Sequence, residues 1–202
     1  MTRIRLTREQ SRDQTRQRLM DAAQSIFIER GVAAASVEEI SEAAGYTRGA
    51  FYSNFDSKLE LFLALLRRDH DRIMRGMEDI FDDASAADME ARVLQYYSTI
   101  YRDNKCFLLW VEARMQAVRD PQFKERFAEF VREKRQAIID YIDRFAARVG
   151  TPLPLPPKQL ALGLVALCDG MQFFHTLDPQ DVPDEVVQSV LDGFFRKVAL
   201  DA

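Results

Sequence analysis

Apolar residues recur every three or four positions along almost the whole of this chain, which is the spacing of amphipathic helices. No segment alternates apolar and polar residues in the way that a half-buried strand does. The pattern predicts helices at about residues 12–30, 36–44, 47–54, 57–81, 89–103, 105–119, 121–149, 158–176 and 184–199. We therefore expect an all-α protein.

Polar residues stand where several of these predicted helices begin. Ser36 is followed three residues later by Glu39, the spacing of a capping box, and residues 57–60 repeat the pattern. The Asp-Pro pair at 120–121 fits a helix N-cap followed by proline at the first helical position. The proline-rich segment 151–157 cannot be helical, so we expect an extended connector there.

The composition is that of an ordinary folded protein, with 47% hydrophobic and 30% charged residues in 202. The N-terminus lacks the apolar stretch of a secretory signal, and no apolar run approaches the about 18 residues of a membrane helix. We therefore expect a cytoplasmic protein with no membrane partner. Cys106 and Cys168 lie in apolar helical segments, which favours buried free thiols over a disulfide.

Positive charge is concentrated at the N-terminus, although the whole chain has a net charge of −4. Residues 1–18 contain six arginines and only two acidic residues. Such a local positive field favours contact with nucleic-acid phosphates. A solvated basic tail explains the same charge equally well.

Residues 36–62 carry the most informative pattern of the chain. Two short predicted helices are joined by a turn that contains Gly45. Their apolar residues can close a small core with the first helix: Val37, Ile40, Ala44, Phe51 and Phe55. Two short helices, a tight turn and a supporting helix are the parts of a helix-turn-helix DNA-binding motif.

The second helix of this motif would be the recognition helix. Phe51 and Phe55 lie four residues apart and face inward, so another face is left exposed. That face carries Thr47, Arg48, Gly49, Tyr52 and Ser53. Arg48 can reach guanine edges in the major groove, and Gly49 allows close backbone approach. Thr47 is the expected N-cap, where free amides suit a phosphate. A solvated surface pair of Arg48 and Tyr52 is the alternative.

Lys58 occupies the first turn of the next predicted helix, where the helix dipole disfavours a cation. An unfavourable local position suggests another role, such as pairing with a DNA phosphate. Alternatively the position has no meaning, because an exposed lysine there costs only a few tenths of a kcal/mol.

Residues 12–62 strongly resemble the DNA-binding head of the TetR/AcrR family of bacterial regulators. The matching residues are Arg16 to Phe27 leading to Gly31, Ser36 to Ile40, Ala43-Ala44-Gly45, and Thr47-Arg48-Gly49-x-Phe51-Tyr52-x-x-Phe55-x-x-Lys58-x-x-Leu61-Phe62. The resemblance implies that Thr47, Arg48, Gly49, Tyr52 and Ser53 line the major groove, and that Ser36 and Lys58 hold phosphates. Position 54 is Asn where His is commoner in the family, and Asn54 can still donate to a phosphate.

The resemblance also implies an organisation and a function. Residues 1–56 would form a three-helix DNA-binding head and residues 57–202 a roughly six-helix body for ligand binding and dimerisation. We expect a repressor that a small apolar or aromatic ligand releases from double-stranded operator DNA. A transcriptional activator and an all-helical small-molecule-binding protein are the alternatives.

Nothing in the sequence points to catalysis. The chain contains only two histidines, and it shows no metal-ligand spacing, nucleophile elbow or glycine-rich phosphate loop. We therefore expect a protein that is not an enzyme and that needs no cofactor or metal.

The last two helices are the predicted dimer contact, as they are in the family. The final helix has one apolar row of Val186, Val190 and Phe194, and another of Val187, Leu191, Phe195 and Val198. Two rows make a stripe wide enough to pack on the parent body and on a partner. A single intramolecular core is the alternative.

The middle helices are rich in aromatic residues, which could enclose a pocket for an unidentified effector. The aromatics are Phe62, Phe81, Tyr97, Tyr101, Phe107, Trp110, Phe127, Phe130, Tyr141, Phe173 and Phe174. The chosen ligand contacts are Phe62, Tyr97, Tyr101, Phe107, Trp110, Phe127, Phe130 and Phe174, with Arg114 and His175 as polar groups. Ordinary core packing is the stronger alternative for any one of them.

Overall fold

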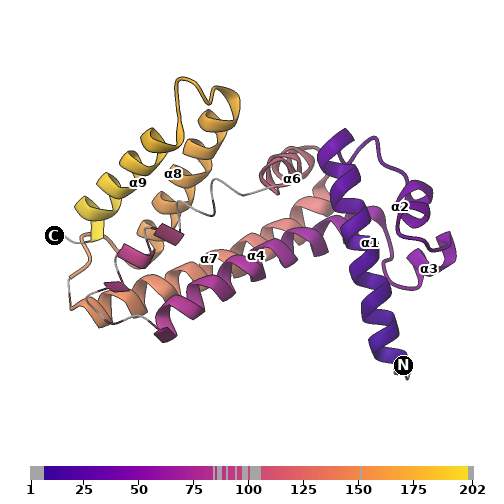
Figure 1. Cartoon of the computed structure of the whole chain (residues 1–202), viewed down its shortest axis with the longest axis horizontal. Coiled ribbons are helices and arrows are strands. Elements are labelled where there is room, and N and C mark those ends of the chain that lie inside the picture. Colours follow the sequence, from indigo (N-terminus) through magenta and orange to yellow (C-terminus); the bar gives the residue numbers. More distant parts are fainter. Residues whose placement is uncertain are drawn as a thin grey trace, which may run out of the picture. The chain divides into compact units, whose positions relative to one another are not determined.

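The computed structural model describes residues 7–83, 85, 88–89, 91–93, 95–96, 100, 106–150 and 152–199. Within these residues the helices are α1 (Arg8–Arg30), α2 (Val37–Ala43), α3 (Arg48–Tyr52), α4 (Lys58–Asp83), α6 (Phe107–Arg119), α7 (Pro121–Val149), α8 (Pro157–Leu177) and α9 (Asp184–Ala199) (Figure 1). No strand occurs in this part of the chain, so the all-α prediction is confirmed. Two predicted ligand residues, Tyr97 and Tyr101, lie outside the described residues.

The chain divides into two compact units. The first unit contains Met1–Asp69 and Lys105–Phe127, and the second contains His70–Asn104 and Ala128–Ala202. Helices α4 and α7 therefore each contribute residues to both units. The functional boundary that we predict at residue 56 is a different division of the chain, and it stays a prediction.

The predicted starts of α2, α3, α4, α7, α8 and α9 are confirmed, that of α1 is not, and much of the predicted helix at 89–103 lies outside the described residues. The side chain of Ser36 accepts from the Glu39 amide, and the carboxylate of Glu39 accepts from the Ser36 amide, as a capping box requires. Oδ1 of Asp120 accepts from the amides of residues 122 and 123, which confirms the N-cap of α7. Helix α1 begins at residue 8 instead of 12, because Thr7 starts a capping box of its own.

Stacked aromatic rings form part of the core of the first unit. The ring of Phe62 lies edge-on to that of Phe27, with centroids 5.8 Å apart, and parallel to that of Phe123, with centroids 6.0 Å apart. Nearby, Nε1 of Trp110 donates to a carboxylate oxygen of Asp69 at 2.9 Å. Because Trp110 belongs to α6, this helix is packed into the first unit.

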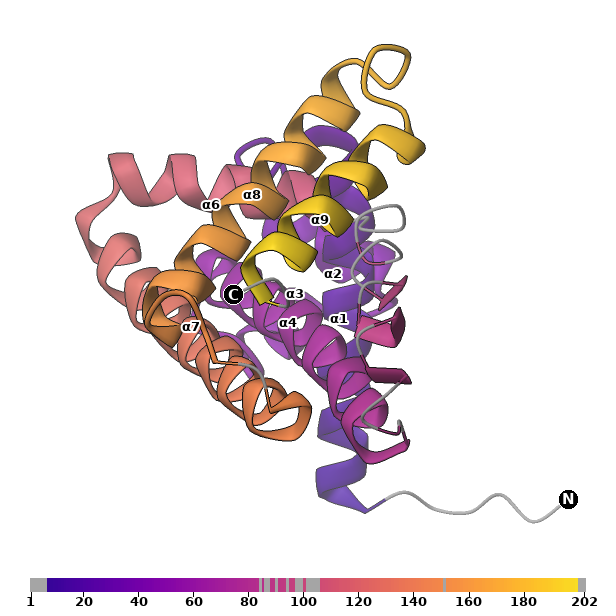
Figure 2. The ribbon, with the colours of Figure 1, turned by 90° about the vertical axis from the view of Figure 1, so that its left-hand side faces the viewer.

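Two hydrophobic clusters make up the core of the second unit. The α4 cluster consists of Met77, Ile80, Phe81, Met89, Val93 and Phe145. The α8–α9 cluster consists of Ile138, Ala161, Leu164, Cys168, Val187 and Leu191. Helices α8 and α9 lie side by side as a pair (Figures 1 and 2). The segment 152–156 before α8 is not helical, as its three prolines predict, and both cysteines are buried and free, also as predicted.

Candidate functional site

A tight turn sets α3 against α2. Gly45 adopts φ +75°, the left-handed conformation that a side chain would disfavour. The amide of Tyr46 donates to the Ser41 carbonyl at 2.8 Å and closes the turn. Oγ1 of Thr47 then accepts from the Ala50 amide at 3.2 Å, which confirms Thr47 as the N-cap of α3.

The inner side of α3 is fixed to α1. Phe51 and Phe55 are buried, and the guanidinium of Arg16 lies 4.0 Å from the centroid of the Phe55 ring. The same guanidinium donates to the carbonyl of Asn54 at 2.6 Å, just beyond the end of α3. A cation at a helix C-terminus satisfies an orphan carbonyl and complements the dipole. Five residues of helix are thus held in a fixed orientation.

The outer side of α3 is exposed. It consists of the residues predicted to face the major groove, namely Thr47, Arg48, Gly49, Tyr52 and Ser53. Nη1 of Arg48 lies 2.8 Å from a carboxylate oxygen of Glu38 on α2, and its guanidinium lies 5.5 Å from the Tyr52 ring centroid. A hydrogen bond with Tyr52 and the charge of Glu38 raise the pKa of Arg48. Sequence reasoning missed Glu38, because no helical spacing relates it to Arg48.

The predicted phosphate contact of Asn54 stays a prediction. Its side chain is buried, and Nδ2 donates to the Ala50 carbonyl at 2.8 Å. The cause is local: residue 54 comes directly after the last turn of α3, where the chain turns inward to bury Phe55.

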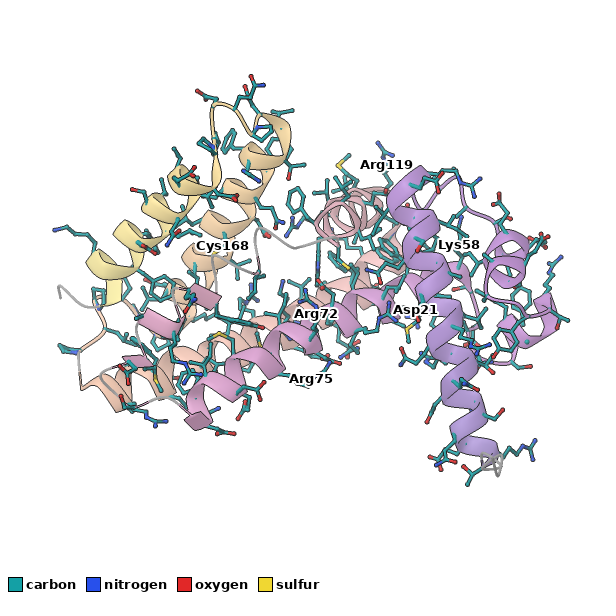
Figure 3. The ribbon with its side chains drawn as sticks, in the orientation of Figure 1. Asp21, Lys58, Arg72, Arg75, Arg119 and Cys168 are labelled. Carbon is teal, nitrogen blue, oxygen red and sulfur yellow. The ribbon has the colours of Figure 1, made fainter. Side chains whose placement is uncertain are left out.

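Lys58 and Ser36 have partners inside the protein. Nζ of Lys58 donates to the carbonyl of Ala35 at 2.6 Å and to that of Ala33 at 3.3 Å, and burial lowers the pKa of this lysine. Figure 3 shows Lys58 at the start of α4, close to the segment between α1 and α2. The Ser36 hydroxyl donates to Glu39 at 3.0 Å. Phosphate binding by either residue stays a prediction.

The predicted ligand residues that the structure describes do not line one cavity together. Four of them are buried in the first unit: Phe62, Phe107, Trp110 and Phe127. In the second unit, Phe130 is buried edge-on to the His70 ring, whereas the side chain of Phe174 is 55% exposed. Nδ1 of His175 lies 2.8 Å from the Val182 carbonyl oxygen, and Arg114 is half-buried.

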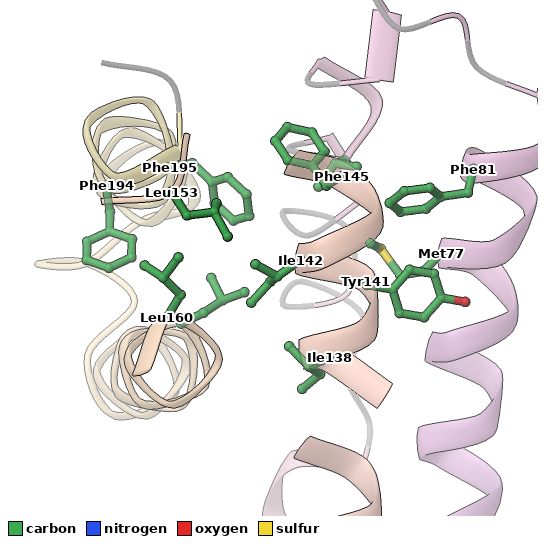
Figure 4. A pocket seen from close by; sticks show the side chains of 12 residues that line it. Met77, Phe81, Ile138, Tyr141, Ile142, Phe145, Leu153, Leu160, Phe194 and Phe195 are labelled. Atoms are coloured by element: carbon green, nitrogen blue, oxygen red, sulfur yellow. The ribbon is translucent and has the colours of Figure 1, made fainter. Parts of the chain in front are cut away.

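A cavity of about 70 Å³ lies instead within the second unit, and none of the predicted ligand residues that the structure describes lines it. It is lined by side chains of α4, α7, α8, α9 and the connector, including Met77, Tyr141, Leu153, Leu160 and Phe195 (Figure 4). Phe81 and Tyr141 of the wider aromatic set are among the lining residues. Leu153, an apolar residue between two prolines of the connector, is the feature of the sequence that points to this cavity.

Two family profiles match the chain. The profile of bacterial regulatory proteins of the tetR family matches residues 19–65, and that of the C-terminal part of BetI-type transcriptional repressors matches residues 85–199. The second match covers more than half of the chain. The protein belongs to the TetR family. The resemblance of residues 12–62 is thereby confirmed, together with the fold class.

Curated relatives agree with this family assignment. The HTH-type transcriptional activator FasR of Mycolicibacterium smegmatis is 29% identical over 183 residues, 89% of this chain and 81% of FasR. The regulator TtgR of Pseudomonas putida is 27% identical over 183 residues, 83% of this chain and 82% of TtgR. TetR-family proteins are DNA-binding transcriptional regulators that act as dimers and respond to small molecules. This TetR-family member is accordingly a ligand-responsive regulator and not an enzyme.

Solved structures share the fold. A transcriptional regulator from Rhodococcus sp. Rha1 superposes with a TM-score of 0.74 at 21% identity, over 93% of this chain and 97% of that one. The SmeT–triclosan complex gives 0.66 at 23% identity, over 91% and 90% of the two chains. FadR from Bacillus subtilis with stearoyl-CoA gives 0.70 at 17% identity, over 88% and 96%.

Proposed function

We propose that this TetR-family protein is a cytoplasmic repressor that binds double-stranded operator DNA as a homodimer and is released by a small apolar ligand. The single observation that carries DNA recognition is the exposed face of α3, held outward by buried Phe51 and Phe55. Activation is the second candidate, because FasR is named an activator. A promoter-reporter assay with and without the gene decides between repression and activation.

Selection of bound duplexes from a random pool, followed by binding titrations of the selected sequence, tests the DNA surface. Arg48→Ala should relax base preference at one position by about 1–3 kcal/mol. Arg119→Ala removes the same charge from an exposed position of α6 and should preserve that preference. An equal loss of affinity on every sequence for Arg48→Ala would contradict base recognition by this residue.

Exposed apolar side chains on α8 and α9 support dimerisation through these two helices. Val187 and Leu191 are buried in the protein's own core, whereas the neighbouring row of Val186 and Val190 is about 40% exposed. On α8 the exposed apolar residues are Leu162, Phe173, Phe174 and Leu177. Monomeric proteins rarely leave so many large apolar side chains together in water.

Helix α8 is also long and apolar enough to pass for a membrane span, with a mean hydropathy of 1.4. Only 28% of its apolar window is buried. One such helix is weak support for a membrane span, and a partner α8–α9 pair would cover the same surface.

Analytical ultracentrifugation tests the proposed dimer interface. Phe173→Glu should give monomers, and Val118→Glu, at an exposed position of α6, should leave dimers intact. Persistent Phe173→Glu dimers would contradict this interface.

Ligand release is proposed from the cavity in the second unit. The related structures hold triclosan, an apolar aromatic compound, and stearoyl-CoA, whose acyl chain is apolar. Met77 and Phe81 in the cavity lining belong to α4, the helix that begins at Lys58 beside the DNA-binding helices. Suppose that α4 can adopt two placements and that the ligand binds one of them more tightly. The ligand then changes the operator affinity by at most the difference between its affinities for the two placements. Operator titrations with and without ligand test this coupling, and unchanged affinity at saturating ligand would contradict it.

A further inference from the structure

We propose that the cavity of the second unit accepts only uncharged hydrocarbon groups, such as a small aromatic ring, and that a ligand acts there by separating the α8–α9 pair from α7. This inference rests on the proposed function, since it names the chemistry and the action of the effector site.

The described lining of the cavity offers a ligand almost no hydrogen-bonding group. Among the lining residues that the structure describes, every side chain is apolar except that of Tyr141. The Tyr141 hydroxyl donates a hydrogen bond to the Glu78 carboxylate, and Nη1 of Arg144 lies 3.1 Å from the same carboxylate. Figure 4 shows this hydroxyl directed toward α4, away from Leu153 and Leu160. A charged or strongly polar ligand would therefore lose its water contacts and gain no partner.

The cavity lies between the two hydrophobic clusters of the second unit. It shares Met77, Phe81, Val93 and Phe145 with the α4 cluster, and it shares Ile138 and Leu164 with the α8–α9 cluster. Protein interiors normally leave few voids of this size between packed elements. An apolar ligand would gain dispersion contacts with both clusters at once.

The size of the cavity implies movement of its walls. Its volume is about 70 Å³, smaller than the engineered cavity of about 150 Å³ that binds benzene in another protein. An aromatic ring therefore fits completely between the walls only if one of them moves. The wall formed by Leu160 of α8 and by Phe194 and Phe195 of α9 faces Ile142 of α7 across the cavity (Figure 4). Because close-packed side chains do not compress, the ring pushes these two walls apart.

Binding of toluene, benzoate and benzylamine to the full chain tests the chemistry without DNA. The three probes share one ring and differ in charge. Isothermal titration should give toluene an affinity at least about tenfold higher than that of either ion, because an unpaired charge is strongly disfavoured in an apolar cavity. Comparable affinities for toluene and benzoate would overturn the proposal.

Cavity variants locate the toluene site. Leu160→Phe should fill the cavity and weaken toluene binding at least about tenfold, whereas Leu108→Phe, at an exposed position of α6, should not. Circular dichroism checks that each variant is folded. Full toluene affinity in folded Leu160→Phe would overturn the assignment.

Spin labels measure the proposed separation. Labels at Asp143→Cys on α7 and Lys158→Cys on α8 occupy exposed positions within the second unit. Toluene should lengthen the distance between them, and an unchanged distance with bound toluene would overturn the mechanism. Operator binding is a separate measurement: if it succeeds while toluene fails to bind, only this inference fails.

We infer independently that Glu38 is a positioning residue for Arg48. Glu38 lies in the first turn of α2, where the helix dipole favours a carboxylate, 2.8 Å from the Arg48 guanidinium. The pair holds Arg48 beside the Tyr52 ring on the exposed face of α3. A fixed guanidinium suits the directional hydrogen bonds of a base edge better than contact with any nearby phosphate. The Glu38 carboxylate also repels phosphates that approach Arg48.

Removal of the Glu38 carboxylate should lower the sequence specificity of DNA binding and raise the affinity for DNA of any sequence. Glu38→Gln should raise affinity for random duplex and lower the ratio of operator to random binding by about tenfold, as expected for loss of one good base contact. Glu42→Gln is the matched control, because it removes the same charge one turn later on α2, where Glu42 has no ion pair with any described residue. Identical ratios for the two variants would overturn the role of Glu38. Failure of the unmodified protein to prefer any sequence would instead refute the proposed function.

Discussion

Lys58→Met should destabilise the protein even in the absence of DNA. The ammonium of Lys58 donates to the Ala35 carbonyl at 2.6 Å and to the Ala33 carbonyl at 3.3 Å, and Ala35 is only 3% exposed. A hydrogen bond from a charged group contributes about 1.5–3 kcal/mol when it is well shielded. Lys58 is only half-buried, and water can replace it at exposed Ala33, so we expect a loss of about 1–2 kcal/mol.

Urea denaturation of Lys58→Met measures this loss, and Lys124→Met at an exposed position of α7 is the control. Operator titrations at several salt concentrations then separate structure from DNA contact, because each lost phosphate contact lowers the salt slope by about 0.9. Two results together would refute a structural role for Lys58. They are a stability change within about 0.5 kcal/mol, which is the range of ordinary surface substitutions, and a lower salt slope.

Three further outcomes follow from the structure. Phe62→Ala should lower the free energy of unfolding by about 3–5 kcal/mol in urea titrations, since the ring is fully buried and stacked. A hydrogen bond from the Ser36 amide lowers the pKa of Glu39. The ionised Glu39 carboxylate therefore stabilises the folded protein above the ordinary carboxyl pKa, and this stabilisation is lost as the pH falls through the lowered pKa. Acid unfolding should therefore become less pH-dependent in Glu39→Gln than in the unmodified protein. Asp120→Ala should cost about 1 kcal/mol in thermal unfolding, through loss of the α7 N-cap.

Local chemistry made most of the fold predictable. Ser36 and Asp120 start helices, and Gly45 ends a turn, because each needs only neighbours within a few residues. The inward position of Phe51 and the exposure of Arg48 likewise follow from a helical spacing of four residues.

Long-range contacts account for what the sequence did not predict. Lys58 finds its carbonyl partners more than 20 residues away, and Glu38 meets Arg48 across a helix boundary. The cavity depends on how α7, α8 and α9 pack, so single aromatic residues could not be sorted into pocket and core. Phe62 is core, whereas Leu153, an aliphatic residue of the connector, lines the cavity.

The docking of α6 limits how this regulator can be recombined with others. A carboxylate oxygen of Glu112 on α6 accepts from the Val32 amide at 2.7 Å, and Nε2 of Gln24 on α1 donates to Sγ of Cys106 at 3.2 Å. A hybrid regulator joined after residue 56 would keep the Val32 amide and Gln24 but would lose their partners, Glu112 and Cys106. Chimaeras should therefore transfer α1, α2 and α3 together with α6 and the start of α4, or rebuild these contacts in the recipient.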